Sequence, residues 1–315
     1  VYKILINTLN TKSKRGVTMK IFAKAAFERG QIQTKIHIGT DGIEIQLLED
    51  YKKNPINRIE ALDIIKETTA DIYAIHMPLP DDGFELQNLF RNKEQYVLHN
   101  VCSLAHTISN YLNHRIIIVI HLGMGLNELQ KQGLLVDITN ELKTLQDRYP
   151  LLDFCFENII PVTLNKKLQS FNLRPEGYLF EGVDLVRHLR NQGVANCGTV
   201  FDICHALITL NFFQMLECEN LPSPVDSLDT FFEKNKDVIK LMHLSSAQGL
   251  GYVKDTHGIP YSSKNKDELI ATIGLYNKYK YTCPVTLEVF ETDFLKSDNY
   301  RTTKAMVETV VNSRY

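Results

Sequence analysis

Short apolar runs alternate with longer amphipathic segments along the chain. The apolar runs are rich in β-branched residues and predict strands over residues 2–7, 42–48, 71–77, 115–122, 152–158, 198–204, 238–244 and 284–290. The other segments repeat apolar residues at helical spacing and predict helices over residues 17–29, 56–68, 94–113, 126–148, 180–192, 206–236 (with a break at Pro222 and Pro224), 265–279 and 300–313. Almost continuously apolar strands separated by helices are typical of a parallel sheet with a covered outer face.

The number of strand and helix units favours a closed barrel. Eight such units in 315 residues fit a single (β/α)8 TIM barrel, an α/β fold that would span residues 1–315 as one domain. The alternative, a doubly wound sheet, ordinarily carries a glycine-rich phosphate turn after its first strand. This chain has NTLNTKSKRG there, at residues 7–16. We therefore expect the barrel, and we interpret LPSPVDS at residues 221–227 as a helix break within it.

Composition and charge narrow the class of protein. The chain is 44% hydrophobic and 23% charged, as ordinary soluble proteins are, and its net charge of −2 provides no overall basic field for nucleic acid. No apolar run reaches the length of about 18 residues that a membrane span needs. The six cysteines form no CxxC pair, which is typical of reduced, packed thiols. These features predict a cytoplasmic protein without a membrane association, and they imply no protein partner.

Polar residues close most of the predicted strands. The stretch GTVFDICHALI at residues 198–208 shows this most clearly, because an apolar run ends on Asp202 and His205. Burial of an unpaired carboxylate costs several kcal/mol, so such a group must be exposed, hydrogen-bonded or bound to a cation. In a barrel, the carboxyl ends of the strands form the active face. The strand endings at this face are Glu44, His76, His121, Glu157, Asp202 with His205, His243 and Glu288, and the loop after the seventh strand adds Asp255 and His257.

These residue types indicate a metal centre. A single histidine at a strand end is usually structural, but titratable residues near the same end of seven strands are hard to obtain by chance. Imidazoles and carboxylates without thiolates suit zinc or manganese, and more than four of them suit a multinuclear site. Glu44 could be a further ligand or could pair with a helix or a lysine inside the barrel. Asn158, next to Glu157, is expected to be an amide that lies just outside the ligands and supports them.

The strand endings resemble a known family. FEN (156–158), FDICHA (201–206), MHLSSA (242–247), DTH (255–257) and TLEV (286–289), with His76 in HMP and His121 in HLG, resemble the metal-binding motifs of the xylose isomerase-like TIM-barrel superfamily. Within it they are most similar to endonuclease IV, the AP endonuclease family 2. That resemblance implies a metal-dependent phosphodiester hydrolase with three zinc ions, held by His76, His121, Glu157, Asp202, His205, His243, Asp255, His257 and Glu288.

The resemblance also implies roles for individual residues. Glu157 would bridge two ions and help to orient the attacking hydroxide, and Glu157 and Glu288 would be the catalytic carboxylates. His76 and His121 would serve one ion, and Asp255 with His257 another. Two or three zinc ions are expected as cofactors, with Mn²⁺ or Mg²⁺ as alternatives.

The sequence departs from the endonuclease pattern at two places, and these differences leave a second enzyme class as an alternative. GIPYSSKNKDE follows His257 in place of the Ser-Leu-Gly-Glu-Gly run of the endonuclease, and GIEIQ at residues 42–46 is closer to the sugar isomerases and epimerases. In that branch one Mn²⁺ or Mg²⁺ ion is held by Glu157, Asp202, His243 and Glu288, and the two glutamates transfer a proton at a sugar carbon. A metabolite-binding regulator is a third hypothesis.

Four of the residues outside that set discriminate between the two enzymes. Hydrolysis needs His76, His121, Asp255 and His257, whereas epimerisation needs none of them, so their presence favours hydrolysis. The substrate would be a phosphodiester, with abasic DNA as one possibility, or a sugar in the alternative. The loops at residues 77–93, 123–130 and 159–179 carry no clear basic and aromatic pattern, and LNKKLQSFNLR at residues 164–174 is a modest candidate for DNA contact.

Overall fold

A closed barrel of parallel strands forms the centre of the molecule. The computed structural model describes residues 19–78, 85–91, 94–123, 126–160, 162–165, 170–173, 180–217, 227–248 and 257–313. Within these residues eight strands close in the order β1-β10-β9-β8-β5-β4-β3-β2. They are β1 (Ile21–Ala26), β2 (Gly42–Gln46), β3 (Ile72–His76), β4 (Ile116–His121), β5 (Leu152–Glu157), β8 (Cys197–Asp202), β9 (Ile239–Leu244) and β10 (Val285–Leu287). The predicted (β/α)8 barrel is confirmed.

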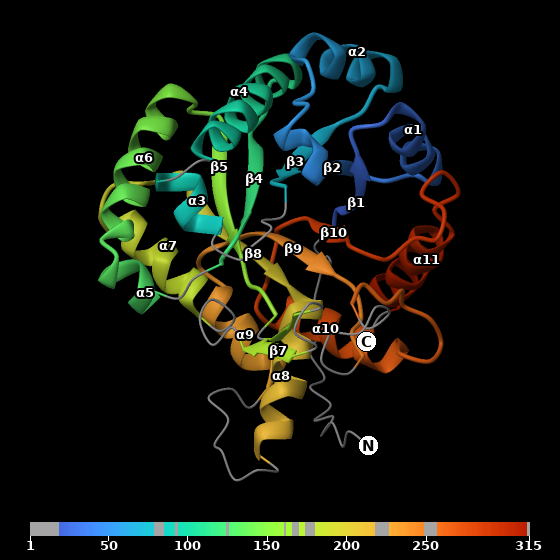
Figure 1. The fold of residues 1–315 in the computed structure, drawn as a ribbon. Coiled ribbons are helices and arrows are strands. Elements are labelled where there is room, and N and C mark those ends of the chain that lie inside the picture. The colour runs from blue at the N-terminus through green and yellow to red at the C-terminus, as the bar shows by residue number, and fades with distance from the viewer. Residues whose placement is uncertain are drawn as a thin grey trace.

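Helices surround the strands (Figure 1). They are α1 (Arg29–Ile38), α2 (Arg58–Thr68), α3 (Glu85–Arg91), α4 (Gln95–Leu112), α5 (Leu126–Lys131), α6 (Leu134–Arg148), α7 (Glu181–Asn191), α8 (Ile203–Glu217), α9 (Leu228–Asn235), α10 (Lys266–Lys278) and α11 (Asp298–Asn312), with a 3-10 turn, η1 (Glu49–Lys52). An antiparallel hairpin of β6 (Val162–Asn165) and β7 (Ser170–Leu173) is inserted between β5 and α7. None of the helices in the described part of the chain has the length and apolar character of a membrane span.

The first strand lies where the sequence predicted a helix. The prediction of a helix over residues 17–29 is wrong, because β1 pairs with both β2 and β10. Its alanines favour a helix, but pairing with two neighbouring strands outweighs this weak preference. Phe22 packs in the barrel interior, whereas Ala23 and Ala25 join the core outside it, as alternation along a strand requires. The strand predicted at residues 2–7 lies outside the described residues.

Two other predicted helices are divided. The segment 126–148 forms α5 and α6, and Gly133 between them has a positive φ of 65°, which a continuous helix excludes. The segment 206–236 forms α8 and α9; Pro222 and Pro224 lie outside the described residues. The strand predicted over 198–204 ends at Asp202, because α8 begins at Ile203. Helices α1 and α3 and the β6–β7 hairpin were not predicted.

Two apolar clusters hold the barrel together. The larger one fills the space between the strands and the surrounding helices. The smaller one fills the barrel interior and consists of Phe22, Ala74, Val119, Cys155, Val200 and Leu241. Each of these six residues comes from a different strand, so the part of the barrel interior that they fill is a packed core and not a pore.

Candidate metal centre

A layer of polar residues lies next to the apolar cluster in the barrel, towards the carboxyl ends of the strands. Two positions after each of the six interior apolar residues come, in the same order, Lys24, His76, His121, Glu157, Asp202 and His243. Because alternate residues of a strand face the same side, these six side chains also face the interior. The strand register that packs the core therefore also assembles the polar layer.

Three other predicted residues join this layer from nearby segments. His205 lies in the first turn of α8, Glu288 follows directly after β10, and His257 lies in the segment that leads to α10. Gly258 fixes that segment: its carbonyl accepts a hydrogen bond from Phe290 N at 2.8 Å, and it has a positive φ of 70°. Asp255 lies outside the described residues.

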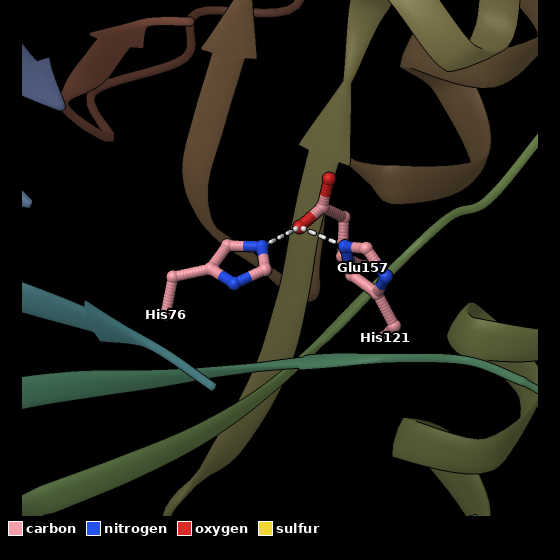
Figure 2. A group of neighbouring side chains, drawn as sticks. All are labelled: His76, His121 and Glu157. Carbon is pink, nitrogen blue, oxygen red and sulfur yellow. Dashed lines mark hydrogen bonds and ion pairs between the residues drawn. The ribbon is translucent and has the colours of Figure 1, made fainter. Parts of the chain in front are cut away.

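The first group of possible ligand atoms comes from His76, His121 and Glu157. Nε2 of His76 lies 3.1 Å from Oε2 of Glu157, and Nε2 of His121 lies 3.5 Å from the same oxygen. Figure 2 shows the two rings converging on this carboxylate from opposite sides. His76 and Glu157 are almost completely buried.

A second group consists of Asp202, His205 and His257. Nε2 of His205 faces Nε2 of His257 at 2.9 Å. Oδ1 of Asp202 accepts a hydrogen bond from His205 N at 2.6 Å, which satisfies a donor in the first turn of α8. Oδ2 of Asp202 is buried and accepts no hydrogen bond among the described residues.

The third group is centred on Nδ1 of His243 and adds Glu157, Asp202 and Glu288. Carboxylate oxygens of these residues lie 3.3, 3.7 and 2.7 Å from this nitrogen, respectively. Glu157 belongs to the first and third groups, and Asp202 to the second and third. The three groups therefore form one continuous cluster that is linked by two shared carboxylates.

The outer nitrogens of three histidines have fixed partners. Nδ1 of His76 lies 2.8 Å from the Met77 carbonyl, and Nδ1 of His205 lies 2.6 Å from the Asn158 carbonyl. A carbonyl can only accept, so both nitrogens donate and leave Nε2 with a lone pair in the neutral ring. Nε2 of His243 lies 3.0 Å from Oε2 of Glu44 and directs Nδ1 into the third group. A fixed outer hydrogen bond of this kind is typical of metal-binding histidines.

Asn158 supports the same cluster from β5 to β8. Its Oδ1 accepts a hydrogen bond from Asp202 N at 2.8 Å, and its Nδ2 donates to Asp202 O at 3.0 Å. The side chain thus pairs with the backbone of Asp202, while its own carbonyl orients His205. This placement agrees with the supporting position expected for it.

The carboxylates of the cluster favour their charged forms. Burial disfavours charge on Glu157, but His243 and His121 outweigh it and hold the pKa of this carboxyl well below the ordinary value. Burial also disfavours charge on Glu288, where Lys24 and His243 hold the pKa well below its ordinary value. Both side chains are therefore ionised at neutral pH, as metal ligands must be.

The pKa values of three histidines in the cluster are shifted in different directions. Burial lowers the pKa of His76 and of His257, and the neighbouring Lys24 and His205, respectively, lower it further. Burial also acts to lower the pKa of His243, but Glu44, Glu157 and Glu288 outweigh it and raise this pKa well above the ordinary value. His243 therefore carries a proton at neutral pH in the ion-free protein, between carboxylates that would otherwise repel one another.

The cluster fits a divalent cation. Its donors are imidazole nitrogens and carboxylate oxygens without thiolates, the set that zinc and manganese accept. The buried Oδ2 of Asp202 has no hydrogen-bond donor in the described part of the chain, and a cation would satisfy it.

The sequence analysis did not identify Lys24 as part of the site, and it did not decide whether Glu44 is a ligand or an ion-pair partner. Nζ of Lys24 lies 2.8 Å from Oε1 of Glu288 and 3.6 Å from Oε1 of Glu44. Glu44 belongs to none of the three groups, and contacts His243, Thr286 and Lys24 inside the barrel. The signal for Lys24 was the alternation of Phe22 and Lys24 with alanines, which is visible only if residues 21–26 are taken as a strand.

Comparison with known proteins gives matches at the level of structure. The sequence matches no known family profile and no curated protein. A 3-keto-D-glucoside 4-epimerase from E. coli has a TM-score of 0.58 and 14% identity, covering 93% of this chain and 100% of that one. An AP endonuclease of family 2 from Brucella melitensis has a TM-score of 0.55 and 14% identity, covering 89% and 96%. A D-psicose 3-epimerase from Clostridium cellulolyticum H10 has a TM-score of 0.58 and 12% identity, covering 93% and 99%.

Both enzyme types that the strand endings resemble are thus represented among the similar structures, together with a xylose isomerase domain protein from Salmonella typhimurium. At these identities the likeness establishes the fold alone. The resemblance inferred from the strand endings is confirmed at that level: the chain has the fold of the xylose isomerase-like TIM-barrel proteins.

Proposed function

We propose that this protein is a metal-dependent hydrolase that cleaves a phosphodiester at a multinuclear centre. The observation that carries the proposal is the position of Glu157. Its Oε2 faces His76 and His121, while its Oε1 lies 3.3 Å from Nδ1 of His243. The two oxygens of one carboxylate thus face different histidines, which is the arrangement that a bridging ligand requires.

The chain's own residues would hold two or three ions, of which zinc suits the donor set best. When bound, such ions supply hydroxide at neutral pH and offset charge on the phosphoryl and leaving oxygens. His76 and His121 both face Oε2 of Glu157. Asp202 belongs to the second group, with His205 and His257, and also to the third group, which Glu288 completes. The fixed outer nitrogens keep the rings aligned, so little reorganisation is needed during reaction.

An alternative function rests on the third group by itself. Glu157, Asp202, His243 and Glu288 form a complete set for one divalent ion, and two glutamates in such a set could move a proton at a sugar carbon. This reading gives no role to His76, His121 or His257, although all three point into the same cluster. We therefore favour hydrolysis.

The first test is metal content together with activity. Elemental analysis of the purified protein should find two to three equivalents of zinc or manganese, and an abasic duplex should be incised while a panel of ketoses is not epimerised. A single equivalent, accompanied by ketose epimerisation, would contradict the hydrolase and support the alternative.

Metal affinity should depend on pH through His243. Its raised pKa means that an ion must displace a proton from Nδ1 at neutral pH. The apparent affinity should therefore fall as the pH is lowered through this raised pKa, beginning above the ordinary imidazole value of about 6.5. Competition with a chromophoric chelator across a pH series measures this. An affinity that falls only below about pH 6 would show that His243 does not exchange its proton for the ion.

A further inference from the structure

Strands β1 and β2 supply no atom to the three ligand groups, yet each places a charged side chain in the same layer. Lys24 and Glu44 are register partners on these neighbouring strands. The Glu44 side chain is completely buried, and the Lys24 side chain is only 13% exposed. Burying a lysine is costly unless its charge is paired, so the position of Lys24 calls for a specific explanation.

The contacts of Lys24 place it between two carboxylates. Nζ lies 2.8 Å from Oε1 of Glu288 and 3.6 Å from Oε1 of Glu44. The other oxygen of Glu288 faces Nδ1 of His243 at 2.7 Å, and the other oxygen of Glu44 accepts from Thr286 at 2.8 Å. Lys24 thus holds the outer oxygen of Glu288 while the inner oxygen points into the third ligand group.

The charges around Lys24 are unbalanced without an ion. Among the described residues the cluster gathers four buried or largely buried carboxylates, from Glu44, Glu157, Asp202 and Glu288, and Lys24 is the lysine that contacts two of them, Glu44 and Glu288. Crowded carboxylates repel one another strongly in a buried site. A fixed cation relieves this repulsion in the ion-free protein, and it also repels an incoming divalent ion.

We infer that Lys24 is a resident cation of the metal centre: it stabilises the carboxylate cluster before metal binds and weakens metal affinity by competing for Glu288. Lys24 is thus a positioning residue that sets the affinity of the centre without being a ligand. The inference rests on the proposed metal site. It predicts that one substitution lowers the melting temperature of the ion-free protein and raises its affinity for the ion. A merely structural role would not produce this combination.

The test compares variants in two measurements: thermal melting in chelator, and zinc affinity by competition with a chromophoric chelator. Lys24→Met should melt at a lower temperature than wild type in chelator but bind zinc at least about tenfold more tightly, because the ion meets one fewer positive charge. Lys24→Arg, which keeps the charge, should remain close to wild type in both. Lys35→Met is the matched control, since Lys35 is also buried and paired with a carboxylate, Glu291 at 3.6 Å, outside the three ligand groups. It should leave zinc affinity unchanged.

A double variant keeps the test decisive if Lys24→Met folds poorly. Lys24→Met/Glu44→Gln removes one charge of each sign, so its melting temperature in chelator and its zinc affinity should return towards wild type. Unchanged or weaker zinc binding by Lys24→Met, or by the double variant relative to Glu44→Gln alone, would overturn the inference while leaving the proposed function standing. If the wild-type protein binds no divalent ion, the proposed function fails and the inference fails with it.

Discussion

Replacement of His121 by alanine should deplete the bound metal and lower phosphodiester cleavage by roughly three orders of magnitude or more. His121 closes the first ligand group with its Nε2 3.5 Å from Oε2 of Glu157. Its loss removes a donor that the multinuclear centre needs and that a single-ion epimerase does not use. Elemental analysis and single-turnover cleavage of the same preparation measure both effects.

His114→Ala is the matched control for this variant. His114 lies just before the other end of the same strand, β4, and Nε2 is 2.7 Å from Oδ1 of Asp71, so it too is a histidine paired with a carboxylate. Its replacement should change neither metal content nor turnover. If His121→Ala also keeps full metal and full cleavage, His121 is a packed strand residue and the hydrolase proposal loses its first group.

The second large effect is expected from Asp202→Asn, through the stability that bound metal adds. An ion that binds only the folded state adds about 2.7 kcal/mol at a free concentration near 100 Kd, so a weakened site lowers the melting temperature of the loaded protein. In chelator the substitution should be neutral or slightly stabilising, because one of several crowded carboxylates is removed. Thermal melts of both proteins, with and without chelator, test this difference.

The structure makes Asp202→Asn a clean variant. An asparagine can still accept the hydrogen bond from His205 N through Oδ1, so the start of α8 keeps its cap. Asp202→Ala removes both the ligand and the cap, and should cost a further amount of about 1 kcal/mol in chelator and metal alike. Equal destabilisation of the chelated and loaded forms by Asp202→Asn would identify the aspartate as a structural residue.

The fold and the strand ends could be predicted because they follow from alternation. A strand in a parallel barrel is apolar on both faces until its carboxyl end, so the first inward polar residue is visible in the sequence. Asp202 after Val200 and His243 after Leu241 show this directly. The structure brings eight of the nine predicted residues into one cluster, although their role as ligands remains a prediction.

The incorrect prediction of a helix in place of β1 also affected the predicted site. Taken as helical, residues 17–29 offered no reason to place Lys24 beside Glu288, and Glu44 was left without a defined partner. The alanines of β1 hide the strand, because local preference is weak and the pairing with β2 and β10 decides the outcome. The contact between His205 and His257 was also beyond local pattern, since it depends on the path of the segment around Gly258.

The outer partners of the three fixed histidines differ in how mutation can reach them. A backbone carbonyl persists whatever side chain occupies its residue, so the ring orientations of His76 and His205 do not depend on the side-chain identity at Met77 or, for this bond, at Asn158. His243 instead depends on the carboxylate of Glu44. A substitution at position 44 can therefore change how the His243 ring is held without replacing any of the candidate ligands.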